Sequence, residues 1–386
     1  MHSPVTALVA RSVADIAARD PSLQGDVFAK VGDSLTASGD FLRCFARDPL
    51  ELGAQGEVRA TIEHFRAGNA RGVDPYRRLS WAATIGWSAW QVLHGSTPPL
   101  AREHADVRPR FALVQFGTND IEIGALHAFS DHLLDIVDWL GARGTIPILF
   151  TLPPRLDDAR ANGEVPRYSA AIRLAAMARR VPLVDFGEAL RSLPHQGIGP
   201  DGIHPTSHQG RRGRDACDLG EEGLKSGYNL RNLLAVQALA RARQALTAAP
   251  ATLDPELPPL AGSGDAGDPH PIASLPFFDV VDEQDGPEGA LRDYSGCAGA
   301  RAAPGRERVY RLTLTTARRV EVIGFDRGGA EADVALLEGR AEGSACRYHG
   351  RRSVSAALGP GTWFVVVDPV SVGTGRRPGE TLVAVL

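Results

Sequence analysis

The chain has 386 residues, of which 43% are hydrophobic and 23% are charged, and its formal net charge is −4. This length favours two domains over one, and the composition is that of an ordinary globular protein. The slightly negative charge argues against a nucleic acid or an anionic membrane surface as a partner. No segment is long and apolar enough to span a bilayer.

Residues 5–18 form an amphipathic pattern, with Arg11, Asp15 and Arg19 at helical spacing. Such a pattern predicts a surface helix and differs from the apolar core of a signal peptide. We therefore expect a mature or trimmed form of a secreted protein, in which the signal peptide is not present.

The first chemically informative segment follows a short apolar run, residues 27–31, which predicts a buried strand. The chain continues as Gly32-Asp33-Ser34-Leu35, and residues 36–48 have the pattern of a following helix. A serine hydroxyl acts as a nucleophile when a neighbouring base takes its proton. Ser34 is therefore the candidate nucleophile, and the alternative is a serine that only caps the next helix.

Strand and helix patterns alternate along the following segments. Such alternation predicts a parallel sheet with helices on both faces, whose sites form at the carboxyl ends of the strands. Ser34, and Asn119 in Gly117-Thr118-Asn119-Asp120, both fall just beyond a predicted strand. The further predicted strands are 111–116, 146–151 and 181–185, and the predicted helices are 125–143, 169–180 and 228–246.

An acid and a base stand three residues apart in Asp201-Gly202-Ile203-His204. His204 is the candidate general base for Ser34, and Asp201 would fix its tautomer and stabilise its charged form. Asp201 and Gly202 also fit a plain turn, and one loop can serve both purposes. The Asn119 side-chain amide is a candidate donor to an oxyanion, or alternatively a helix cap.

These three segments resemble the sequence blocks of the GDSL or SGNH hydrolase family in their residue types and in their order. The resemblance covers roughly residues 20 to 248. The resemblance implies an α/β/α sandwich that hydrolyses esters without a metal or a cofactor. It implies catalytic roles for Ser34, Asp201 and His204. It also implies an oxyanion hole formed by the Ser34 backbone N–H, the Asn119 amide and a glycine N–H. Gly86 matches that glycine best, and Gly95 is the alternative.

The composition changes in the last third of the chain. Residues 249–275 are rich in Pro and Gly and predict a linker between a domain at 1–248 and a domain at 276–386. The last segment has short β patterns without helical periodicity, which predicts an all-β sandwich. Residues 309–314, 333–336 and 359–368 resemble bacterial pre-peptidase C-terminal (PPC-like) domains, which implies an accessory domain of a secreted enzyme. Its predicted strands are 309–315, 319–325, 333–337, 353–358, 363–367 and 381–386.

The four cysteines, Cys44, Cys217, Cys297 and Cys346, lack the C-x-x-C spacing of a zinc site. Two of them fall in each predicted domain. We expect disulfides between Cys44 and Cys217 and between Cys297 and Cys346, which form in an oxidising compartment. The alternative is four small buried apolar residues.

The roles of several aromatic and acidic residues stay open. The helical spacing of Trp81, Trp87 and Trp90 favours core packing over the lining of an acyl or sugar pocket. Stacking on sugars is the alternative to core packing for Tyr310, Tyr348 and Trp363, and Trp363 lies in an apolar strand pattern. Turns are favoured over calcium binding for Asp326, Asp333 and Asp368.

These features predict a secreted bacterial serine esterase that hydrolyses carboxylic acyl esters through an acyl-enzyme. The appended β domain favours an extracellular short-chain or carbohydrate ester, in the manner of a deacetylase, including polymeric substrates. The alternatives are a lipase or polyester-type hydrolase and, in another class, a non-catalytic binding or adhesion module.

Overall fold

The computed structural model describes residues 1–211, 213–247, 252–282, 291, 294–297, 306–327, 330–371 and 379–386. The chain divides into two compact units, Met1–Glu256 and Leu257–Leu386. Within the described residues, every helix is too short or too polar to cross a membrane.

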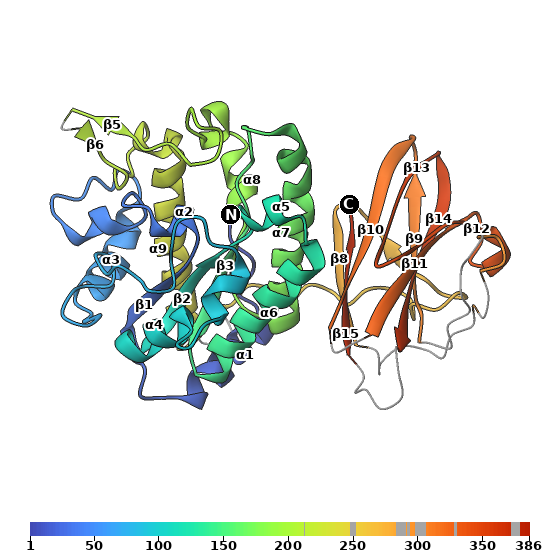
Figure 1. Ribbon diagram of the computed structural model, residues 1–386, viewed down its shortest axis with the longest axis horizontal. Coiled ribbons are helices and arrows are strands. Elements are labelled where there is room, and N and C mark those ends of the chain that lie inside the picture. Colours follow the sequence, from blue (N-terminus) through green and yellow to red (C-terminus); the bar gives the residue numbers. More distant parts are fainter. Residues whose placement is uncertain are drawn as a thin grey trace. The chain divides into compact units, whose positions relative to one another are not determined.

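The first unit is built on a four-stranded parallel sheet (Figure 1). Its strands β1 (Gln24–Gly32), β2 (Pro109–Gln115), β3 (Ile146–Phe150) and β4 (Leu183–Val184) are neighbours in chain order. β2 and β3 are buried along their whole length, as expected for parallel strands covered on both faces. The predicted parallel sheet is confirmed, and the carboxyl ends of its strands lie along one edge.

Helices cover both faces of this sheet (Figure 1). On one face, α4 (Pro99–Val107), α6 (Leu126–Ala142) and α7 (Ala159–Arg179) contact the strands. On the other face lie α3 (Arg59–Arg66) and α9 (Gly227–Ala245), and α1 (Ala7–Arg19) contacts α9. The layers are those of an α/β/α sandwich, as predicted. The shorter elements are α2 (Ser34–Ala37), α5 (Asp120–Ile123), α8 (Phe186–Leu190), the 3₁₀ turns Arg43–Ala46, Gly56–Val58, Ala89–Leu93, Pro194–Gly197 and Gly223–Lys225, and the hairpin β5 (Gln209–Gly210) and β6 (Gly213–Arg214).

The predicted helix at 36–48 is wrong, because α2 ends at Ala37. Leu42 adopts a left-handed backbone with φ of 65°, and its N–H donates to the Asn232 side chain of α9 at 3.0 Å. The Asn232 amide in turn donates to the Asp40 carbonyl at 2.8 Å. These long-range bonds hold the segment in an irregular path that local helical periodicity does not reveal.

The predicted helix at 169–180 begins too late, because α7 starts at Ala159. The Asp158 side chain caps it by accepting from the N–H groups of Arg160 and Ala161 at 2.7 and 2.9 Å. The helix then continues through Pro166, which cannot donate a backbone hydrogen bond. Pro166 made the first two turns look non-helical in the sequence.

The second unit consists mainly of strands in two sheets, so the predicted all-β domain is confirmed. Valine, leucine and isoleucine side chains of both sheets form its core, together with Tyr310 and Trp363. Core packing of Trp363 is therefore confirmed. The sheets have the orders β13-β10-β15-β8 and β12-β11-β14-β9-β7, where the strands are β7 (His270–Ile272), β8 (Phe277–Asp282), β9 (Arg308–Leu314), β10 (Arg318–Asp326), β11 (Ala330–Glu338), β12 (Cys346–Arg351), β13 (Ser353–Leu358), β14 (Gly361–Ser371) and β15 (Glu380–Val385), and a 3₁₀ turn spans Gly343–Ala345.

Two details of the second unit differ from the sequence expectations. Asp326, Asp333 and Asp368 lie in strands rather than turns, and Asp333 faces Asp368 across the β11–β14 ladder. β7 lies inside the segment 249–275 and pairs with β9 in parallel, although its Pro-rich sequence is typical of a linker. Because it pairs with β9, the segment 270–272 belongs to a sheet of the second unit, although the sequence predicted a linker there.

Candidate active site

Ser34 lies at the carboxyl end of β1, as the first residue of α2. The helix cap is the preceding residue, Asp33, whose side chain accepts from the Leu35 N–H at 3.0 Å. Ser34 therefore does not act as the cap. Its hydroxyl instead lies 2.9 Å from Nε2 of His204.

His204 connects Ser34 to Asp201 through its two ring nitrogens. Nδ1 lies 2.7 Å from Oδ2 of Asp201, while Nε2 faces Ser34. This arrangement fits a neutral ring that donates from Nδ1 and accepts at Nε2. Burial raises the pKa of Asp201, but hydrogen bonds from the backbone N–H groups of Ile203 and His204 and from the His204 ring outweigh it, so that the pKa lies below its ordinary value. Asp201 is thus an ionised partner for the ring at neutral pH.

The Asp201–His204 segment is also a turn, as the alternative interpretation held. Oδ1 of Asp201 accepts from the N–H groups of Ile203 and His204, each at 3.0 Å. Gly202 has a φ of 72°, in the left-handed region that favours glycine. The turn and the acid–base pair are therefore one structure.

Asn119 follows β2 and precedes α5. It occupies the N-cap position of α5, yet its side chain makes no capping hydrogen bond. Its Nδ2 donates to the Trp87 carbonyl at 2.9 Å instead. A side-chain amide has two N–H donors, so this bond orients the group while one N–H stays available to a ligand.

Gly86 lies in a segment that is anchored at both ends to the candidate site. On one side, Thr84 N–H donates to the Gly32 carbonyl at 3.1 Å, two residues before Ser34. On the other side, the Trp87 carbonyl accepts from Asn119. Gly86 is exposed and has a φ of 80°. Gly95, the alternative, also has a positive φ, of 110°, but lies beyond the 3₁₀ turn Ala89–Leu93.

Two buried carboxyl groups are sequence neighbours of the candidate site residues: Asp33 precedes Ser34, and Asp120 follows Asn119. Burial raises the pKa of Asp33 to about 6. Burial also raises the pKa of Asp120 to about 7, against the hydrogen bond from the Ala89 N–H and with the help of the Asp33 charge. Both side chains brace a site loop through a backbone N–H, Asp33 at Leu35 and Asp120 at Ala89.

Arg231 of α9 is a fully buried cation that contacts α2, and the sequence does not indicate this role. Its guanidinium donates to the Leu35 carbonyl and to the Thr36 hydroxyl, the latter at 3.0 Å. A third bond reaches Gln115 at the end of β2. Arg231 therefore ties the helix that carries Ser34 to the strand that precedes Asn119. Arg231 is one of three arginines in a Leu- and Ala-rich helix, and its position alone gives little sequence signal for such a role.

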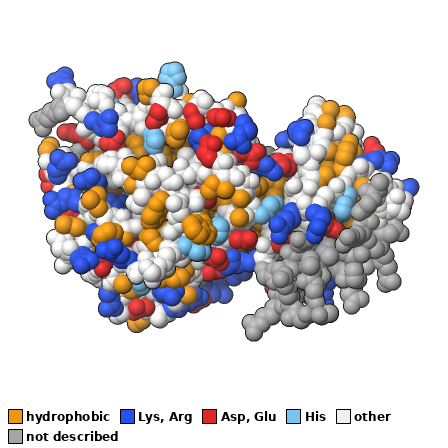
Figure 2. Space-filling model, viewed as in Figure 1, with side chains coloured by type: hydrophobic (Ala, Val, Ile, Leu, Met, Phe, Trp, Pro, Cys, Tyr) orange, Lys and Arg blue, Asp and Glu red, His pale blue; other side chains and the backbone are white. Residues whose placement is uncertain are grey.

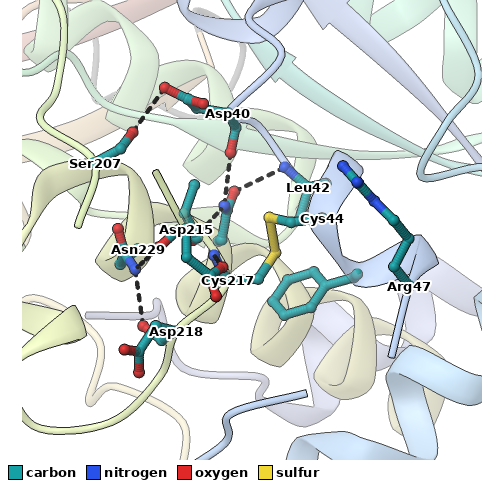
Figure 3. The surroundings of a disulfide bond; sticks show 12 residues. Asp40, Leu42, Cys44, Arg47, Ser207, Asp215, Cys217, Asp218 and Asn229 are labelled. Carbon is teal, nitrogen blue, oxygen red and sulfur yellow. Dashed lines mark hydrogen bonds between the residues drawn. A yellow bond between two sulfur atoms is a disulfide. The ribbon is translucent and has the colours of Figure 1, made fainter. Parts of the chain in front are cut away.

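A disulfide joins the segment after Ser34 to the segment after His204 (Figure 3). It links Cys44 to Cys217, and beside it the Ser207 hydroxyl donates to the Asp40 side chain at 2.7 Å. Both predicted pairings are confirmed, since Cys297 and Cys346 form the second disulfide. The first disulfide supports the side of the site on which Ser34 and His204 meet.

Exposed apolar side chains stand on the loops that carry the site residues. Ile85 precedes Gly86 and is 77% exposed, Ile123 ends α5 and is 65% exposed, and Leu156 is 43% exposed. We call these three residues the apolar rim. Figure 2 shows hydrophobic side chains between interspersed basic and acidic ones on the face of the first unit in view.

An apolar cavity of about 200 Å³ lies between the 3₁₀ turn at Ala89–Leu93 and α6, lined by Trp90, Ile123 and Phe129 among others. The prediction that Trp81 and Trp90 are core residues is wrong, since they are 40% and 48% exposed. The segment before the 3₁₀ turn is irregular rather than helical, so helical spacing did not apply to it. Trp87 is half-buried.

Within the described part of the chain, no cluster of three or more His, Cys, Asp or Glu side chains is arranged to hold a metal ion. A hydroxyl, an imidazole and a carboxylate joined in series can carry out nucleophilic acyl transfer.

Comparison with known proteins identifies a family for part of the first unit. Residues 31–210 match the sequence model of the GDSL-like lipase/acylhydrolase family. Residues 31–210 thus form a GDSL-like lipase/acylhydrolase domain, and the protein is a carboxylic ester hydrolase. A comparison with curated proteins finds no match.

Three solved structures illustrate the similarity. An acetylxylan esterase from Geobacillus stearothermophilus is 15% identical, with 55% of this chain and 93% of that chain covered and a TM-score of 0.35. A GDSL-like lipase from Bacteroides thetaiotaomicron is 16% identical, with 61% and 98% covered and a TM-score of 0.36. The pre-peptidase C-terminal domain of a Bacillus anthracis collagenase is 12% identical, with 29% and 90% covered and a TM-score of 0.21.

Proposed function

We propose that Ser34 is the nucleophile of this ester hydrolase, with His204 as general base and Asp201 as its charged partner. The observation that carries the proposal is the hydrogen-bonded series from Ser34 Oγ through His204 to Asp201, at 2.9 and 2.7 Å. His204 takes the Ser34 proton as the hydroxyl attacks the ester carbonyl. It then returns the proton to the leaving alcohol, and the acyl group stays on Ser34.

Water completes the reaction in a second step. His204 removes a proton from water, which attacks the acyl-enzyme and releases the acid. In both steps a negative charge develops on the former carbonyl oxygen. We assign its stabilisation to the Ser34 N–H, the Gly86 N–H and the Asn119 amide. The bond from Asn119 to the Trp87 carbonyl supports this role, because it fixes the amide before substrate binds.

For the substrate, we propose an extracellular short-chain ester, including acetyl groups on carbohydrate. Asp120, the residue after Asn119, lines the apolar cavity, and we assign the acyl group to this cavity. Its volume of about 200 Å³ corresponds to roughly six or seven non-hydrogen atoms at liquid density, which suits a short acyl group. The two disulfides support maturation in an oxidising compartment and hence secretion from a bacterium.

A lipase or polyester-type hydrolase is the second candidate, and the apolar rim favours it. Ile85, Ile123 and Leu156 would contact a long acyl chain or an apolar polymer surface beyond the cavity. A non-catalytic binding module is the candidate of another class. The intact series of three side chains speaks against it.

The test is the rate of hydrolysis on p-nitrophenyl acetate, octanoate and palmitate and on acetylated xylan, with wild type and Ser34→Ala. We expect activity on acetate and acetylated xylan that Ser34→Ala loses by a factor of about 10⁴ or more. A maximum at palmitate would select the lipase. No hydrolysis of any ester by the wild type would favour the binding module.

A further inference from the structure

Arg155 lies in the segment between β3 and α7, at the carboxyl edge of the sheet. Its side chain is only 6% exposed, although it carries a permanent charge. Two of its nitrogens form a fork with the Asp157 carboxylate, at 2.8 Å each. A buried guanidinium with a bidentate partner is held in one orientation, so its remaining donors can fix other groups.

Those remaining donors reach both sides of Asn119. Nη1 donates to the carbonyl of Thr118, the preceding residue, at 3.0 Å. Nη2 also donates to Glu122 of α5 at 2.6 Å. The strand order places β3 next to β2, which brings Arg155 beside the Asn119 loop. One guanidinium therefore holds the backbone just before Asn119 and the Glu122 side chain three residues after it.

The same segment also contacts the turn that presents His204. The Leu156 N–H donates to the Gly202 carbonyl at 2.7 Å. Asp157 packs closely on this glycine, because a Cβ atom at Gly202 would lie 2.5 Å from the Asp157 N. Gly202 stands between Asp201 and His204. Residues 155–157 are thus attached to the loops of the oxyanion donor and of the general base.

We propose that Arg155 is a positioning residue, which sets the place of Asn119 relative to Ser34 and His204 and thereby raises the rate of the chemical steps. This inference rests on the proposed function. An oxyanion donor acts only if it lies within hydrogen-bond reach of the charge that develops in the transition state. Because a displacement of about 1 Å costs up to 100-fold in rate, loss of the Arg155 contacts should lower kcat rather than substrate binding.

The test uses Arg155→Ala and Arg155→Lys in the full chain, with kcat and KM measured on p-nitrophenyl acetate. We expect kcat to fall about 10- to 100-fold in Arg155→Ala while KM changes little. A smaller loss is expected in Arg155→Lys, because an ammonium group keeps the charge but not the fork. Guanidinium ion at millimolar concentration should restore part of the kcat of Arg155→Ala, which a merely structural loss would not show.

The matched control is Arg179→Ala. Arg179 forms a partly buried ion pair with Asp138 between α7 and α6, at the end of α7 that precedes β4. Its removal should lower the melting temperature and leave kcat unchanged. Arg155 would lose its assigned role if both Arg155 variants kept wild-type kcat, or if Arg155→Ala did not fold and Arg155→Lys kept wild-type kcat. Full activity of Ser34→Ala would instead overturn the proposed function itself.

Discussion

The Asn119 side chain is oriented by a hydrogen bond that does not cap a helix. Its amide is held by the Trp87 carbonyl, and the proposed oxyanion role uses the second N–H. We expect Asn119→Ala to lower kcat on p-nitrophenyl acetate by about 10²- to 10³-fold, with little change in KM. Asn69→Ala, an exposed asparagine in another loop, is the control. Equal kcat values for the two variants would rule out the assigned role.

The raised pKa of Asp120 predicts how the free energy of unfolding depends on pH. Its pKa is raised to about 7 by burial, so the folded protein holds a proton that the unfolded chain loses near pH 4. The stability that Asp120 contributes is therefore present at low pH and is lost as pH rises through 7. Relative to wild type, Asp120→Asn should gain on the order of 3 kcal/mol between about pH 4.5 and about pH 8. Urea unfolding at the two pH values measures it, and an unchanged difference would contradict the raised pKa.

At the scale of elements, irregular segments rather than helices and strands bring the site together. α2 has only four residues, and the chain after it is held by Asn232, by Arg231 beneath it and by the Cys44–Cys217 disulfide. Each of these bonds joins residues more than 170 positions apart in the chain. Such contacts compensate for the low intrinsic stability of a four-residue helix.

Removing the first disulfide should therefore weaken the side of the site where Ser34 and His204 meet. We expect the Cys44→Ser, Cys217→Ser double variant to lose about 2–5 kcal/mol of unfolding free energy and part of its esterase activity near its melting temperature. The matched control removes the disulfide between Cys297 and Cys346 in the second unit. That variant should keep wild-type kcat. Loss of kcat in the control alone would show that the first disulfide does not support the site.

At the scale of the whole molecule, all the proposed site residues belong to the first unit, Met1–Glu256. Its last residues are part of the fold, because Asp254 accepts from the Val5 N–H and from Arg241, both at 2.7 Å. A chain that stops after Glu256 should therefore fold and hydrolyse p-nitrophenyl acetate with kcat within about threefold of wild type. A shortened chain that folds but does not turn over this ester would show that the second unit takes part in catalysis.

The second unit can still matter for a polymeric substrate. If it holds acetylated xylan, the shortened chain should lose activity on xylan while it keeps activity on the soluble ester. Equal activity on both would exclude a substrate-holding role. The comparison needs both substrates, because a general loss of stability would lower the two rates together.

The sequence predicted the parallel sheet, the all-β unit and both disulfides, because these depend on apolar periodicity and on the small number of cysteines. It also indicated Ser34, Asn119, Asp201 and His204 as candidates, because each lies in a short motif that resembles a sequence block of a known family. Arg155 and Arg231 were missed, because an isolated arginine is ordinarily solvent-exposed and its burial depends on partners far along the chain. The exposure of Trp81 and Trp90 was missed because the local backbone is irregular.

The proposed acyl-enzyme on Ser34 can be tested by trapping that intermediate. Wild type and Ser34→Ala would be mixed with p-nitrophenyl acetate, quenched in acid within the first turnovers and digested for peptide mass spectrometry. We expect one acetylated site, Ser34, with a burst of p-nitrophenol of about one equivalent where deacylation is slower. Hydrolysis by Ser34→Ala at the wild-type rate, or acetylation at another residue without any at Ser34, would contradict it.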